Sequence, residues 1–211
     1  MIGTGDGSRP PVKAASRIET ADGSSSIAPG MEELCLRVQQ LSLREQMERN
    51  HFLLMRLNAA NARLIQSLEQ SDVFDAIAEI IANLVGSEEI AVFDFHPAEQ
   101  KFSLAWSSGV EAAALQPFLC GAGMFGRAVR EGLSQYQERQ PETTLLPYEK
   151  NLTACVILKS SGEIVGVIAI FGLLPQKSNL EWADFELLKF LETYGAVAIK
   201  FQRLQEKKVS T

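Results

Sequence analysis

Residues 152–173, LTACVILKSSGEIVGVIAIFGL, decide the fold of this chain. The two parts, 152–159 and 163–173, consist mainly of β-branched and aliphatic residues, which favour strands buried on both faces. Between them, Ser160-Ser161-Gly162 provides the short link and the glycine that are typical of a hairpin turn. This segment therefore predicts an antiparallel pair of buried strands.

A second pair of strands is predicted upstream, at residues 89–95 and 101–107. The first reads EIAVFDF, whereas the second alternates, with Phe102, Leu104 and Trp106 on one side and small residues on the other. Two hairpins with helices at both ends of the domain indicate an α+β fold. The sheet should be mostly antiparallel, because a parallel doubly wound sheet would need a helix between successive strands.

Helices are predicted before and after these strands in the sequence. Ser71 and Asp72 are good N-caps for a helix that ends at Gly86, and Ser178-x-x-Glu181 is a capping box that opens the C-terminal helix. Both helices repeat apolar residues at helical spacing, so each should bury one face. The remaining segments are predicted as a short helix or loop at 110–119, a short strand at 133–137 and a polar loop at 138–151.

Residues 31–69 contain neither glycine nor proline and favour one long helix. A first row of side chains along it has the alternating four- and three-residue spacing of a coiled coil. This first row consists of Leu36, Gln40, Leu43, Met47, Asn50, Leu54, Leu57, Asn61, Leu64 and Leu68. We expect it to pair two copies of the chain as a homodimer, because so long a helix would otherwise expose a large apolar strip.

A second row on the same helix consists of Leu34, Val38, Leu41, Phe52 and Met55. A helix with two apolar rows can face both a partner helix and its own domain. The alternative is an amphipathic helix that packs only within the monomer. The sequence does not say whether paired helices run parallel or antiparallel.

Residues 1–30 are rich in Gly, Ser and Pro and contain no aromatic residue, which indicates a disordered tail. The alternative is a non-functional extension, with Met31 as the true start. The domain organisation is thus a tail at 1–30, a coiled-coil helix at 31–69 and a folded domain at 70–207.

Composition excludes several functional classes. The net charge of −6 lies on residues 70–211, since the charges before them balance, and an acidic domain argues against nucleic-acid binding. The apolar runs are too short to cross a membrane, and no apolar signal core opens the chain. Cys35, Cys120 and Cys155 lack metal-type spacing and suggest reduced thiols in the cytoplasm. Only two histidines are present, so the chain has few of the residues that zinc hydrolysis and Ser-His-Asp catalysis need.

The segment Gly121-Ala-Gly123-Met-Phe-Gly126 matches G-x-G-x-x-G. A dinucleotide fingerprint also needs a strand directly before it and an acidic residue after a second strand, and neither is present here. The glycines instead allow sharp turns before a helix, whose first N–H groups could bind an anion. The alternative is a tight connection without a ligand.

Four segments, in this order and spacing, resemble the GAF domain family. They are the entry helix and strand at 74–95, the glycine-bounded segment at 121–132, the hairpin strand at 162–170 and the closing helix at 182–199. The resemblance spans roughly residues 55–205 and implies a central antiparallel sheet with a cavity on one face. It also implies that the first and last helices lie together on the other face, where such domains commonly dimerise.

The resemblance also allows the family's activities to be compared with these residues. The Asn-Lys-Phe-Asp-Glu signature of cyclic-nucleotide binders is absent, Cys120 lacks the neighbouring histidine of pigment-binding members, and His96 beside Pro97 is a poor haem ligand. Members that reduce free methionine sulfoxide use a cluster of pocket cysteines, and the domain has only Cys120 and Cys155. We therefore expect no cofactor, no metal and no catalytic residue.

If the cavity exists, aromatic and polar residues of the first strands and the glycine segment should line it. The candidates are Phe93, Asp94, Phe95, Ser103, Trp106, Gly123, Met124 and Phe125. Asp94 needs a partner within an apolar strand, and Arg127 and Arg130 are candidates. The alternative is that the aromatic residues fill the core and close the cavity.

These patterns favour a non-catalytic signalling module that binds a small ligand or a partner protein and dimerises through its long helices. The identity of that ligand and of that protein is open. A scaffold protein with a filled pocket and a GAF-type free methionine sulfoxide reductase are the two alternatives.

Overall fold

The computed structural model describes residues 29–112, 115, 117–121, 123–137, 149 and 151–209. The chain divides into two units, residues 1–47 and residues 48–211. Helix α1 (Pro29–Gln70) begins in the first unit and ends in the second. Residues 1–28 of the predicted tail and most of the loop predicted at 138–151 lie outside the described residues.

The second unit contains a six-stranded antiparallel sheet in the order β3-β2-β1-β6-β5-β4. Both predicted hairpins are confirmed, by the pairing of β1 with β2 and of β5 with β6. Residues 118–119 form a short edge strand rather than the predicted helix or loop. The strands are β1 (Ile90–His96), β2 (Lys101–Ser108), β3 (Phe118–Leu119), β4 (Gln135–Tyr136), β5 (Ala154–Ser160) and β6 (Glu163–Ile170).

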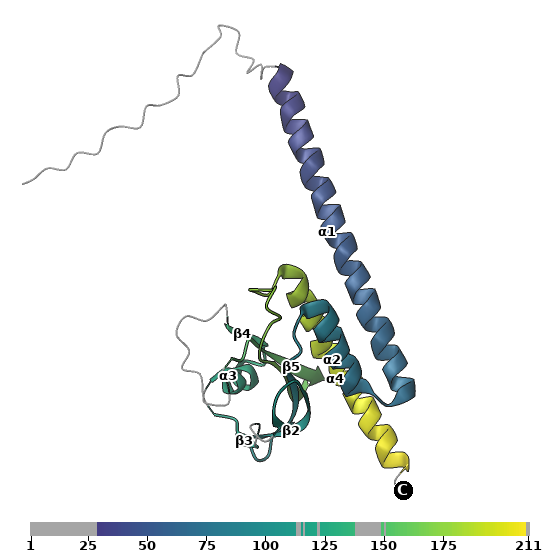
Figure 1. Ribbon diagram of the computed structural model, residues 1–211, viewed down its shortest axis with the longest axis vertical. Helices are drawn as coiled ribbons and strands as arrows, with labels where there is room; N and C mark the ends of the chain where they lie inside the picture. The colour runs from purple at the N-terminus through teal and green to yellow at the C-terminus, as the bar shows by residue number, and fades with distance from the viewer. Residues whose placement is uncertain are drawn as a thin grey trace, which may run out of the picture. The chain divides into compact units, whose positions relative to one another are not determined.

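Helices cover both faces of this sheet (Figure 1). On one face lie α2 (Val73–Ile80) and α4 (Trp182–Val209), and a π-helical turn, η1 (Ile81–Val85), continues α2. Gly86 ends this turn as predicted, with φ of 84°. The other face carries α3 (Gly123–Glu131). No helix within the described ranges is long and apolar enough to cross a membrane.

The helix starts differ in detail from the predicted caps. No side chain of Ser71 or Asp72 caps α2; instead Gln202 of α4 accepts a hydrogen bond from the Val73 N–H at 3.0 Å. The capping box predicted at Ser178-x-x-Glu181 lies three residues too early. Helix α4 begins at Trp182, and Asp184 Oδ2 accepts a hydrogen bond from the N–H of Glu181 at 2.7 Å. Tertiary contacts therefore determine which of several candidate residues caps the start of each helix.

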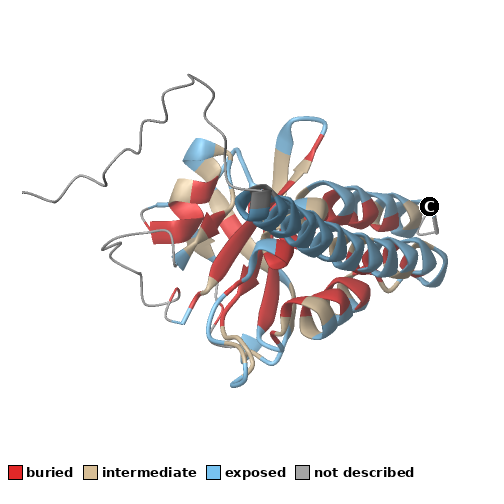
Figure 2. Cartoon of the chain, turned by 90° about the horizontal axis from the view of Figure 1, so that it is seen from above, coloured by how far each residue is buried: buried red, intermediate tan, exposed pale blue. Residues whose placement is uncertain are grey.

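The sheet separates two apolar clusters. The helix-side cluster joins alternate residues of β1, β5 and β6 to α2, α4 and the end of α1, and the α3-side cluster joins the other strand residues to α3. Figure 2 shows buried residues along the strands and exposed residues along much of α1. The sheet is thus buried on both faces, as the apolar runs predict.

Candidate functional site

The α3 side of the sheet is where the resemblance places a cavity, and four phenylalanine rings meet there. Phe118 lies 5.4 Å from Phe93, 5.4 Å from Phe102 and 5.0 Å from Phe125, measured between ring centroids. These distances are those of closely packed aromatic pairs. Phe93, Phe102 and Phe125 are at most 1% exposed, so these rings form a packed apolar layer beneath α3.

The first turn of α3 binds a carboxylate of the chain itself. Glu149 is fully buried, and its Oε1 accepts the N–H of Phe125 at 3.0 Å. Gly123 has φ of 76°, and a Cβ there would lie 2.1 Å from Glu149 Oε2. Only glycine leaves room for this carboxylate. The anion expected at this helix start is therefore supplied internally, and no pattern in the predicted loop pointed to Glu149.

The eight predicted pocket residues do not share one face of the sheet. Five of them lie on the α3 side, namely Phe93, Phe95, Gly123, Met124 and Phe125. The other three lie on the helix side, because side chains alternate along β1 and because a bulge after Val92 shifts the register of β2. Any ligand-binding role for the eight stays a prediction.

The three helix-side residues have partners on that face. Asp94 forms an ion pair with Arg203 of α4, not with Arg127 or Arg130, and is directly paired across the strands with Ser103. Ser103 Oγ lies 2.7 Å from His96 Nε2. Trp106 stacks on Phe74 of α2, with their ring centroids 6.4 Å apart.

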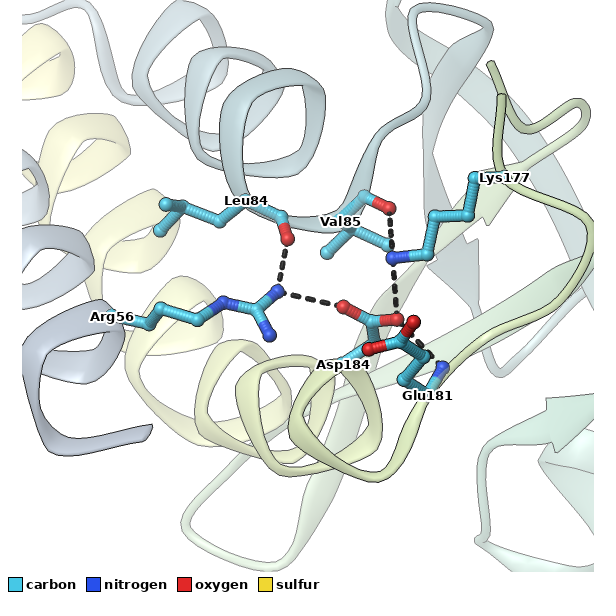
Figure 3. Close-up of polar contacts among 6 residues, drawn as sticks. All are labelled: Arg56, Leu84, Val85, Lys177, Glu181 and Asp184. Atoms are coloured by element: carbon cyan, nitrogen blue, oxygen red, sulfur yellow. Dashed lines mark hydrogen bonds and ion pairs between the residues drawn. The ribbon is translucent and has the colours of Figure 1, made fainter. Parts of the chain in front are cut away.

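A buried ionic cluster joins the helices on this side of the sheet, and we call Arg56, Lys177 and Asp184 the ionic node. Figure 3 shows the two cationic side chains pointing toward Asp184. Asp184 is fully buried, and its Oδ1 accepts a hydrogen bond from Arg56 at 2.6 Å, while its Oδ2 lies 2.5 Å from Lys177 Nζ. Two positively charged side chains thus bind one buried carboxylate and compensate its negative charge.

The same cations bind the end of the π-helical turn. Arg56 donates to the carbonyl oxygen of Leu84, and Lys177 donates to that of Val85 at 2.7 Å. These carbonyls lack partners within their own helix, and cations are favourable at a helix C-terminus. The node therefore connects α1, η1, the segment before α4 and the first turn of α4. Sequence analysis missed it, since nothing local distinguishes Arg56 from the other arginines of α1.

No protein-family model and no curated protein matches the sequence. Solved structures do match. The GAF domain of a phosphoenolpyruvate-protein phosphotransferase from Coxiella burnetii superposes with a TM-score of 0.58 and 14% identity, covering 74% of this chain and 96% of that domain. The fold is that of a GAF domain.

Two further solved structures share this fold with the GAF-like domain. Residues 122 to 287 of a methyl-accepting chemotaxis protein match with a TM-score of 0.53 and 16% identity, over 69% of this chain and 98% of that one. A free methionine-R-sulfoxide reductase from Neisseria meningitidis, solved with its substrate, matches with a TM-score of 0.52 and 16% identity, over 71% and 89%. The same fold therefore occurs in a signalling protein and in an enzyme.

Both cysteines of the GAF-like domain have a pKa that is raised above the ordinary value of a thiol. Burial raises the pKa of Cys155 well above its ordinary value, and the charges of Glu149 and Cys120 raise it further. Burial also raises the pKa of Cys120, against a smaller lowering by Arg130. Because the thiolate is the nucleophile, this arrangement does not activate either cysteine. Among the residues that the structure describes, no group of three His, Cys, Asp or Glu residues could hold a metal.

Thiol labelling checks this arrangement. At about pH 7.5 we expect exposed Cys35 to react first, Cys120 more slowly and Cys155 only after unfolding. Because the folded pKa of both domain thiols is raised, the unfolded chain loses these protons first as the pH rises. The contribution of the two thiols to folding stability is therefore complete below the ordinary pKa of a thiol and decreases as the pH rises above it. Rapid labelling of Cys155 in the native chain would contradict this assignment.

The first row of α1 changes its environment within the second unit. Leu64 is buried in the helix-side cluster, and Leu57 and Leu68 pack against that cluster. These three residues therefore face their own domain. This corrects the prediction that they contact the long helix of a second copy. The other predicted pairing residues are exposed, namely Leu36, Gln40, Leu43, Met47, Asn50, Leu54 and Asn61.

An apolar row also lies on the outer surface of α4. Tyr194, Val197, Phe201 and Leu204 follow the four- and three-residue spacing of a packed helix and are 44–55% exposed. Phe190 precedes them at the same spacing and stacks on Tyr194, with ring centroids 4.6 Å apart. The helix thus buries one face in the GAF-like domain and leaves a second apolar row in solvent.

Proposed function

We propose that the chain is a non-catalytic signalling module that acts as a homodimer through α1 and α4. One observation carries this proposal, namely the exposed apolar rows on both helices. In residues 30–47 of α1, seven large apolar side chains are 56–72% exposed: Met31, Leu34, Leu36, Val38, Leu41, Leu43 and Met47. A helix with so many exposed apolar residues is poorly stable alone in water, and pairing would bury them.

The signalling role rests on how the helices connect to the GAF-like domain. The ionic node joins α1 to η1 and to the start of α4, so a change in the packing of these elements would reach α1 directly. Binding of a small ligand or a partner protein would then bias how the paired helices pack. The free cysteines support placing this module in a reducing cytoplasm.

A scaffold without a small ligand is the second candidate. The packed rings beneath α3 and the internal carboxylate of Glu149 favour it, because they occupy the face where a ligand would bind. In this case the surfaces of α1 and α4 alone carry the function.

Native mass spectrometry of the purified full chain tests both candidates. We expect a dimer, and a stoichiometric extra mass on each subunit would select the ligand sensor, whereas a bare dimer would favour the scaffold. The double variant V197E/F201E should weaken the dimer if α4 takes part, and the exposed neighbour Lys200→Glu is the matched control. A wild-type chain that stays monomeric at high concentration would overturn the proposed self-association.

Reduction of free methionine sulfoxide is the enzymatic alternative, and the Neisseria neighbour is the reason to test it. Turnover would be measured with wild-type chain, a thiol reductant and free methionine sulfoxide. We expect none, because burial raises the pKa of both domain thiols and so disfavours the reactive thiolate. Turnover that is lost in Cys120→Ser or Cys155→Ser would replace the non-catalytic proposal.

A further inference from the structure

An open hollow borders the ionic node at Lys177. Its volume is about 360 Å³, and the residues that form it come from three places in the chain: just after β4, just before β5 and between β6 and α4. At about 30 Å³ for each water molecule, this space holds a molecule of on the order of ten non-hydrogen atoms. The described residues that line the hollow are Gln137, Thr153, Leu173, Lys177, Ser178 and Asn179.

The lining of the hollow is mainly polar, and no carboxylate belongs to it among the residues that the structure describes. Thr153 Oγ1 donates a hydrogen bond to the carbonyl oxygen of Phe171 at 2.7 Å and keeps its lone pairs as acceptors. Within the described ranges, no hydrogen bond joins the side chains of Gln137, Ser178 or Asn179 to another residue. The hollow therefore offers hydroxyl and carboxamide groups to a small polar molecule.

Lys177 gives this hollow a positive charge. Its ammonium group has three N–H donors, and Asp184 and the carbonyl oxygen of Val85 accept two of them (Figure 3), which leaves the third for a ligand. The ionic node combines two cations with one carboxylate, so it carries an excess positive charge. The side chain of Lys177 is 20% exposed and that of Arg56 is 9% exposed, so Lys177 is the more accessible of the two cations.

We infer that the hollow binds a small organic carboxylate that also carries a hydroxyl or amide group, with its carboxylate on Lys177. This inference rests on the ligand-sensor form of the proposed function and places the ligand away from the packed rings beneath α3. The lysine donates a charge-assisted hydrogen bond to the carboxylate, and the hydroxyl and carboxamide side chains bind the remaining polar groups. Leu173 provides an apolar contact for a short carbon chain.

A ligand on Lys177 also acts on the ionic node. The ammonium group then divides its charge between the ligand and Asp184, so its attraction for Asp184 decreases. Asp184 depends more on Arg56, which belongs to α1. Occupancy of the hollow is thereby linked to the contact between α1 and the start of α4.

Lactate and lactamide test this chemistry, because the two molecules have nearly the same shape and differ in charge. Each would be titrated to about 50 mM into the isotope-labelled full-length chain at constant ionic strength, since ligands of few atoms bind weakly. By NMR, we expect lactate to shift the backbone amide signals of Gln137, Thr153 and Lys177, and lactamide to leave them unchanged. Equal shifts with lactamide, or no shift with either molecule, would overturn the inference.

Asn179→Asp tests the place of the site, because it adds a negative charge to the hollow without removing a contact of the ionic node. It should raise the dissociation constant of lactate at least about 10-fold. Asn83→Asp is the matched control, because Asn83 is also exposed and lines a separate hollow of about 140 Å³. The control should change the dissociation constant less than about 2-fold, and similar effects of the two variants would overturn the inference.

The position of the shifted signals separates this inference from the proposed function. Lactate shifts at Gly123 and Phe125, without shifts around the hollow, would move the ligand to the α3 side and overturn this inference alone. A wild-type chain that is monomeric in native mass spectrometry would overturn the proposed self-association, whichever signals lactate shifts.

Discussion

Replacing Asp184 by asparagine is expected to lower the free energy of unfolding by about 3–5 kcal/mol. The substitution keeps the shape of the side chain but leaves Arg56 and Lys177 without their counter-charge. Asp184 is fully buried, and Arg56 is only 9% exposed in its side chain, so water does not replace the lost carboxylate. Urea unfolding followed by circular dichroism measures the effect, at one protein concentration because dimerisation would add to stability.

An exposed ion pair on α1, the helix that also carries Arg56, provides the control. Arg37 and Glu33 lie 2.8 Å apart in α1, with side chains 71% and 65% exposed. Glu33→Gln should change stability by no more than about 0.5 kcal/mol, because exposed pairs contribute little. Similar losses for Asp184→Asn and Glu33→Gln would show that the node does not hold the helices together.

Replacing Phe102 by alanine is expected to cost about 3–5 kcal/mol of folding stability. Phe102 is fully buried, and its ring centroid lies 5.1 Å from that of Phe95, 5.4 Å from Phe118 and 5.5 Å from Phe125. Removing it leaves a cavity among large rings that cannot all move to fill it. Thermal and urea unfolding of the variant measure the loss.

Leu119 in the neighbouring strand β3 is the control for this substitution. It is 69% exposed, so Leu119→Ala should change stability by only a few tenths of a kcal/mol. A loss below about 1 kcal/mol for Phe102→Ala would show that the α3 side of the sheet is loosely packed. That result would favour the ligand sensor over the scaffold.

Much of the secondary structure could be predicted because its signals are local. The apolar runs on either side of Ser160-Ser161-Gly162 predicted β5 and β6, and Gly86 marked the end of the first domain helix. The capping residues were less predictable, because Ser178, Glu181 and Asp184 all suit a helix start. Only the contacts with Arg56, which is buried, and with Lys177, which is half-buried, explain why Asp184 is the one used.

The candidate site was predicted less well because its contacts are distant in sequence. Asp94 was expected to need a partner, but its partner Arg203 lies 109 positions away, on the helix side of the sheet. Glu149 reaches the start of α3 from a segment with no recognisable pattern. The bulge after Val92, which separates Trp106 from Phe102, depends on the pairing of two strands rather than on either strand alone.

Alternation of apolar residues, turn glycines and the long glycine-free segment were enough to predict an α+β domain behind a long helix, because these features act over a few residues. Tertiary structure alone decided which of the two rows on α1 packs against the GAF-like domain. Both rows have the right spacing, and only the packing of Leu57, Leu64 and Leu68 beside α2 and α4 distinguishes them. Periodicity shows that a helix face is apolar, whereas the surface that buries that face is formed by residues far away in the chain.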